Sequence, residues 1–185
     1  MKKLLLLLLI FSPLFCFSQQ TVVKKSKTIV STNINWWKFE KENYSILHPQ
    51  DWVIDTSGTM GSSFILFAPV ENEADKFKEN LNLLVQDLKG NSIDMNQYVS
   101  LSENQIKSMI KNSSILESKA VKNDSVQYHK ISFTGEQGTY KLRFEQHYYL
   151  HNSKSYVLTF TYEQSKAEEY RRMGELMLSS FRLKD

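Results

Sequence analysis

From residue 115 to residue 162 the chain alternates between apolar and polar side chains, and short turn-forming sequences interrupt the alternation. A period of two residues is typical of β-strands that bury one face. Four strands are predicted, at residues 115–121, 126–133, 140–150 and 156–162, with turns at Asn123-Asp124, 135–138 and Asn152-Ser153. Because such turns are too short for a crossover, consecutive strands must be antiparallel neighbours in one sheet. The fold must therefore be built around an antiparallel sheet.

The strand at 140–150 has the most regular alternation. Its apolar positions are Tyr140, Leu142, Phe144, Tyr148 and Leu150, and its polar positions are Lys141, Arg143, Glu145 and His147. This pattern predicts a half-buried strand whose polar face is either solvated or covered by a helix. In the preceding strand the apolar phase changes between Tyr128 and Ile131, which predicts a β-bulge at that point.

Two helices are predicted, one on each side of this strand region. The first spans residues 94–111 and begins with a capping box of Asp94 and Gln97. Its apolar stripe consists of Met95, Tyr98, Val99, Ile106, Met109 and Ile110. The second starts at a similar box of Ser165 and Glu168, and its inner stripe consists of Tyr170, Met173, Gly174, Met177 and Phe181. Helices that pack on an antiparallel sheet define an α+β domain.

The segment before the first helix is predicted to contribute shorter strands. These lie at residues 44–47, 52–54, 64–68 and 81–86. We expect residues 48–51 to form a turn, because a proline cannot donate to a strand ladder and aspartate favours turns. The charged segment 71–79 is expected to be a surface loop with one helical turn. No internal repeat and no second domain is visible in the sequence.

The first eighteen residues have the layout of a secretory signal peptide. Lys2 and Lys3 precede an apolar run that is too short for a membrane span, and Cys16 and Ser18 offer small side chains at the −3 and −1 positions of a cleavage site before Gln19. We expect residues 1–18 to be removed, residues 19–35 to form a flexible segment and residues 36–185 to form the single domain. A lipid anchor at Cys16 is not expected, because the residue before it is the bulky Phe15. The mature protein would be periplasmic or secreted, without a transmembrane segment or a thiol.

Three segments carry a resemblance to known proteins. Residues 44–52 read Tyr-Ser-Ile-Leu-His-Pro-Gln-Asp-Trp, residues 82–85 form a short apolar strand, and residues 178–182 read Leu-Ser-Ser-Phe-Arg. Together they resemble the PsbP-like families of the Mog, PsbP and DcrB types, from Phe39 to the C-terminus. The resemblance implies an αβα sandwich with a central antiparallel sheet and flanking helices. It also implies a non-enzymatic binding or assembly role, and it carries over no catalytic residues.

The composition and motifs limit the possible functions. The net charge is +3, and it falls to +1 without Lys2 and Lys3, which is weak support for a nucleic-acid partner. Ser62 and Ser63 follow a glycine but lack the sequence of a nucleophile elbow. No glycine-rich phosphate loop is present either. We therefore predict a protein that is not an enzyme and needs no cofactor.

Two pairs of residues are candidates for a site. His129 and His147 fall at outward positions of strands that are predicted to pair, so the two rings could share a metal ion with Glu145. The simpler interpretation is that they are solvated surface histidines. Trp36 and Trp37 are adjacent at the edge of the domain, so they should face opposite ways, and one of them is a candidate contact residue.

The sequence thus favours an exported, monomeric binding or assembly factor that acts on an envelope or secreted protein. A carrier of a small ligand or metal, and a hydrolase with an unrecognised site, are the alternatives.

Trp52 follows a tight turn, so we expect its ring to cap the core of the domain.

Overall fold

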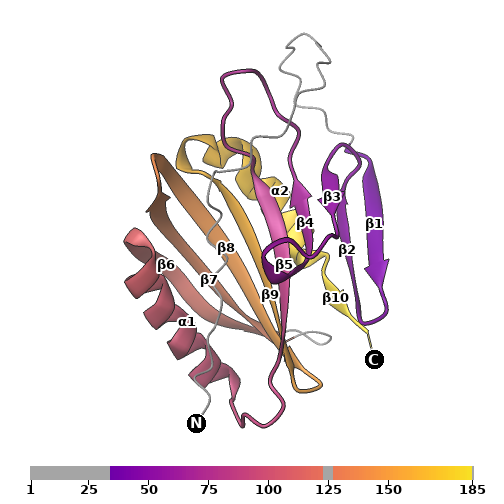
Figure 1. Cartoon of the computed structure of the whole chain (residues 1–185), viewed down its shortest axis with the longest axis vertical. Coiled ribbons are helices and arrows are strands. Elements are labelled where there is room, and N and C mark those ends of the chain that lie inside the picture. The colour runs from indigo at the N-terminus through magenta and orange to yellow at the C-terminus, as the bar shows by residue number, and fades with distance from the viewer. Residues whose placement is uncertain (1–33, 123–126, 185) are drawn as a thin grey trace.

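A computed structural model describes residues 34–122 and 127–184. Its strands form two antiparallel sheets (Figure 1). The smaller sheet has the order β1-β2-β10, and its strands are Trp36–Lys41, Tyr44–Pro49 and Arg182–Leu183. The larger sheet has the order β3-β4-β5-β9-β8-β7-β6. Its strands, in chain order, are Val53–Asp55, Ser62–Phe67, Asn80–Asp87, Lys111–Lys122, Gln127–Gln137, Tyr140–His151 and Lys154–Glu163.

The four consecutive strands predicted from the alternation are antiparallel neighbours, as expected. β6 pairs with β7, β7 with β8 and β8 with β9. The turn at Asn152 and Ser153 is also confirmed, and both residues have a positive φ, as a tight two-residue hairpin requires. The predicted turn at Asn123-Asp124 lies outside the described residues.

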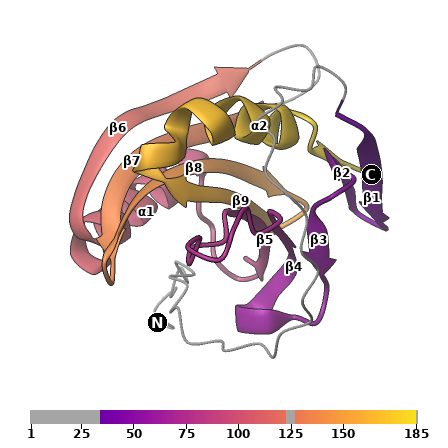
Figure 2. The same cartoon turned by 90° about the horizontal axis from the view of Figure 1, so that it is seen from above.

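The two helices cover opposite faces of the larger sheet, which gives the αβα arrangement (Figure 2). Helix α1, Met95–Met109, packs with Tyr98, Val99 and Ile106 in one apolar core. Helix α2, Ala167–Ser179, packs with Tyr170, Met177 and Leu178 in the other core, which also contains the smaller sheet. The predicted α+β fold with a central antiparallel sheet is therefore confirmed.

Only one of the two predicted capping boxes forms. The Asp94 side chain accepts a hydrogen bond from the Gln97 amide at 2.8 Å, and the Gln97 side chain accepts one from the Asp94 amide at 3.0 Å. At the second site a short 3₁₀ turn, Gln164–Lys166, precedes α2, and Lys166 rather than Ser165 is the N-cap residue. The prediction for Ser165 was wrong because this extra turn moves the start of the helix.

The polar face of β8 is not solvated. Glu145 and His147 are buried, so the strand is covered on both faces rather than half-buried. This face belongs to the side of the sheet on which α2 lies, which is the second of the two alternatives drawn from the sequence. Burial on both faces also explains the phase change at Tyr128 and Ile131, because these residues contact different cores. The register instead shifts on the partner strand β6, between Lys111 and Ser114 and again between Ile115 and Glu117.

Several local expectations need correction. His48 and Pro49 belong to β2, so the turn is shorter than predicted, and Gly135 belongs to β7 rather than to the hairpin loop. Segment 71–79 contains one hydrogen-bonded turn, in which the Asp75 amide donates to the Asn72 carbonyl at 3.1 Å, but Glu79 at its end is buried rather than on the surface. Met109 is exposed and lies outside the apolar stripe of α1.

The predicted signal peptide and Cys16 lie outside the described residues. Within residues 34–122 and 127–184, neither helix has the length and apolar character that crossing a bilayer demands.

Candidate functional site

A surface cleft of about 670 Å³ lies where four separate segments of the chain meet. Its walls are formed by residues 34–35 before β1, the turn after β2, the chain that follows β4, and the first two turns of α2. Its lining consists of Ile34, Asn35, Pro49, Gln50, Asp51, Trp52, Pro69, Val70, Glu71, Glu169, Tyr170 and Met173. This volume is in the range of pockets that bind small ligands or peptide side chains.

The floor of the cleft is aromatic and rigid. The backbone amide of Trp52 donates to the Pro49 carbonyl at 3.1 Å, and this tight turn directs the indole into the core. The indole centroid lies 6.1 Å from the ring of Phe160 and 6.5 Å from that of Tyr170. The expectation that Trp52 caps the core agrees with this packing, and the same ring supports the cleft.

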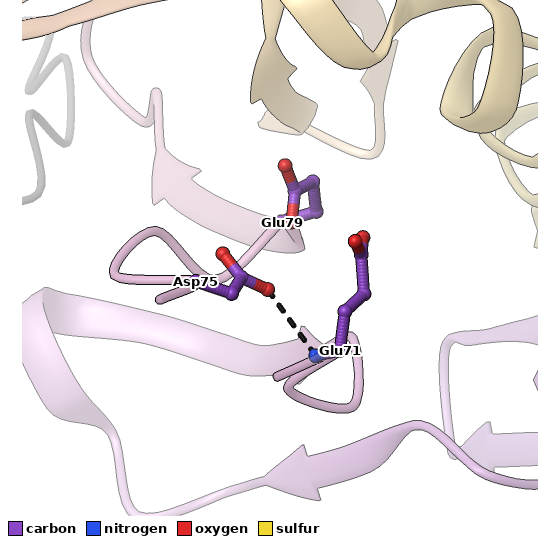
Figure 3. Close-up of side chains that lie close together, drawn as sticks. All are labelled: Glu71, Asp75 and Glu79. Carbon is purple, nitrogen blue, oxygen red and sulfur yellow. Dashed lines mark hydrogen bonds between the residues drawn. The ribbon is translucent and has the colours of Figure 1, made fainter. Parts of the chain in front are cut away.

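A charged cluster adjoins the cleft at Glu71. Figure 3 shows the side chains of Glu71, Asp75 and Glu79 converging from one loop, and the Glu71 amide donates to Asp75 at 3.3 Å. The Lys166 ammonium, at the start of α2, lies 2.9 Å from Glu71, 3.3 Å from Asp75 and 3.6 Å from Glu79. The Tyr170 hydroxyl donates to the same Glu71 oxygen at 3.0 Å. The cluster thus fastens the loop to α2.

The cluster perturbs the titration of its members. Burial raises the pKa of Glu79 from 4.5 to about 6, although Lys166 opposes this effect. Burial alone would lower the pKa of Lys166, but its hydrogen bond to Glu71 and the charges of Glu79 and Asp75 raise it overall. Lys166 therefore stays protonated at neutral pH.

The three carboxylates are close enough to ligate a metal ion, since one oxygen of each lies within 4.8 Å of the others. The Lys166 ammonium, however, already pairs with all three carboxylates. A divalent cation would have to displace this ammonium, so the arrangement fits a structural ion-pair cluster better than a metal site.

The structure does not bring His129 and His147 together. His129 is opposite Tyr148 and His147 is opposite Lys130, so the two imidazoles project from opposite faces of the sheet. His129 bonds to the Ser118 hydroxyl at 2.9 Å, and burial lowers its pKa. His147 is buried with its ring centroid 4.4 Å from that of Tyr128. The shared metal site does not form because the register between β7 and β8 offsets the two residues by one position.

Trp36 and Trp37 differ in exposure, as adjacent residues of a strand should. Trp36 is partly buried and packs against the core, whereas Trp37 is 55% exposed on the edge strand β1. Neither residue lines the cleft. A contact role for Trp37 stays a prediction.

Sequence reasoning missed the cleft. Its parts come from residues 34–35, 49–52, 69–71 and 169–173, and no local pattern connects them. The sequence analysis had assigned Trp52 to the core and segment 71–79 to a solvated loop. The Tyr-x-x-x-x-Pro-x-x-Trp spacing in residues 44–52 was the one signal near the site, and it was interpreted as structural.

Comparison with known proteins gives the class of fold. No family model matches the chain, and no curated protein matches it in sequence. Solved structures resemble it over most of its length, and CyanoP, LpqN and Mog1p are among them. The PsbP protein CyanoP of Synechocystis sp. PCC 6803 aligns with a TM-score of 0.61 and 13% identity, over 88% of this chain and 99% of CyanoP.

Two further structures extend the similarity. LpqN of Mycobacterium tuberculosis, described as involved in cell envelope biogenesis, aligns at 8% identity and TM-score 0.58, over 83% of this chain and 93% of its own. The Ran-binding protein Mog1p of Saccharomyces cerevisiae aligns at 10% identity and TM-score 0.55, over 83% of this chain and 97% of its own. The chain therefore has the PsbP-like fold that its sequence resembled.

Proposed function

We propose that the protein is an exported, non-enzymatic binding or assembly factor that engages an envelope or secreted protein through this cleft. The observation that carries the proposal is the cleft itself, which combines a rigid aromatic floor with an exposed apolar and carboxylate rim. Buried aromatic anchors surrounded by a polar rim are typical of protein contact surfaces. The signal-peptide layout of residues 1–18 supports export.

The chemistry of the lining supports binding more than catalysis. The described lining residues include no serine, cysteine or histidine, so they offer no nucleophile with an adjacent imidazole base. The adjacent carboxylates are engaged by Lys166. A Ran-binding protein and a protein involved in cell envelope biogenesis have the same fold, so this fold accommodates binding roles.

The test is co-purification of tagged protein from crosslinked cells of its native host, compared between two charge-introducing variants. Val70→Glu changes an exposed residue of the cleft, and Leu101→Glu changes a similarly exposed residue on α1, on the opposite face of the sheet. We expect a reproducible envelope or exported partner that is lost in V70E and kept in L101E. A partner that both variants retain, or no partner above background for the unchanged protein, would overturn the proposal.

A further inference from the structure

The cleft is acidic although the chain as a whole is not. The net charge of the chain is +3, yet the charged residues that line the cleft are Asp51, Glu71 and Glu169, all carboxylates. Lys166 is close by, but it pairs with Glu71 and with two carboxylates outside the lining. The negative character is therefore a local property of this surface.

Two of these carboxylates are free to meet a partner. The side chains of Asp51 and Glu169 are exposed, and neither carboxylate makes a hydrogen bond or ion pair with another residue of the described structure. Partial burial and the nearby charges of Glu71 and Asp75 raise the pKa of Glu169, although Lys166 opposes this effect. A cation placed beside Glu169 would thus be attracted by several carboxylates at once.

Apolar side chains border the same carboxylates. Ile34 is 39% exposed and Val70 is 50% exposed, and Met173 also contributes to the lining. The alkyl stem of a lysine or arginine packs on such a surface while its charged end reaches the rim. The cleft therefore offers apolar contact and negative charge within one hollow.

We propose that the cleft receives a basic, partly apolar peptide segment of the partner protein. A lysine or arginine of that segment lies beside Glu169 and Asp51, and its apolar neighbours contact Val70 and Ile34. Charge complementarity of this kind directs the choice of partner and the rate of encounter. The inference rests on the proposed function and adds the chemistry of the partner to it.

Fluorescence anisotropy with labelled nine-residue peptides tests the inference on the full exported protein. The probe alternates lysine and valine, and the comparison peptides alternate glutamate or serine with valine. We expect only the lysine peptide to bind, and its binding should weaken with added salt, since the screening length falls from about 10 Å at 0.1 M to about 3 Å at 1 M. Equal binding of all three peptides would overturn the inference.

Matched variants locate the binding. The double variant Asp51→Asn with Glu169→Gln should bind the lysine peptide about tenfold more weakly. The double variant Glu42→Gln with Glu175→Gln removes the same charge from exposed positions outside the cleft and should bind unchanged. Similar losses in both double variants would show a non-specific charge effect and overturn the inference.

The chain itself carries a basic sequence at residues 24–27, and this is the competing occupant. The lysine peptide could bind only after Lys24, Lys25 and Lys27 are changed to glutamine. That result would mean that this chain's own basic segment occupies the cleft, and it would overturn the inference that the occupant is a partner protein. If no peptide binds while V70E still loses its cellular partner, the inference fails but the proposed function stands.

Discussion

The buried imidazole of His147 should make the folded protein sensitive to mild acid. The residue is 5% exposed, its ring lies against Tyr128, and its Nδ1 has no hydrogen-bond partner among the described residues. Burial lowers the pKa of His147 from 6.5 to about 3, and the positive charge of Lys130 contributes to the same shift. The folded state therefore holds this imidazole neutral.

The size of the effect follows from the difference between the folded and unfolded states. A group whose folded pKa is depressed contributes its full stability above its unfolded pKa and loses it as the pH falls below that value. At pH 5 the unfolded imidazole is largely protonated and the folded one is not. The free energy of unfolding should fall by about 2 kcal/mol between pH 7.5 and pH 5 from this residue alone.

Urea unfolding of the unchanged protein and of His147→Phe at pH 7.5, 6 and 5 measures this contribution. Repacking around the new ring changes stability by an amount that does not depend on pH, so only the difference in pH dependence reports titration. We expect the unchanged protein to lose about 2 kcal/mol more than the variant across this range. Parallel curves, or an NMR titration midpoint of the His147 ring near 6.5, would refute the reasoning.

Three further variants test the packing and the charge cluster. Glu79→Gln should be more stable than the unchanged protein at pH 8 by about 1 kcal/mol and equal to it at pH 4. Burial raises the pKa of Glu79 to about 6, so the stability that the protonated carboxyl contributes is lost as the pH rises through that value, and urea unfolding at both pH values checks the sign. Gly174→Ala should destabilise the protein by about 1–3 kcal/mol and lower its Tm, because the new Cβ would lie 2.2 Å from the Phe160 ring. Alanine by itself favours helices, so a raised Tm would contradict this packing. Asp94→Ala should cost about 1 kcal/mol by removing the capping box of α1, and circular dichroism during thermal unfolding measures the loss.

Features that depend on local sequence could be predicted. The capping box of Asp94 and Gln97, the two-residue turn at Asn152 and the antiparallel order of the last four strands depend on neighbours in the chain, and the structure contains all three. The charge pattern of segment 71–79 indicated a solvated loop. Its end is buried, and Glu79 there pairs with Lys166, which is far away in the sequence.

Features that depend on tertiary contacts could not be predicted. The alternation in β8 correctly assigns residues to two faces, but it does not show that His147 on the polar face is buried. The register that separates His129 from His147 depends on how β7 pairs with β8 across a turn. The cleft needs Trp52, Val70 and Glu169 to meet, and no sequence spacing connects them.

Site-specific photocrosslinking in the native host tests the central claim, that the cleft is the partner-binding surface, most directly. A photoreactive amino acid would replace Val70 in one strain and Leu101 in another, because both side chains are exposed and Val70 lines the cleft whereas Leu101 lies on α1. We expect irradiation to join an envelope or exported protein to the Val70 position and not to the Leu101 position. Adducts of equal yield at both positions, or at Leu101 alone, would contradict the account.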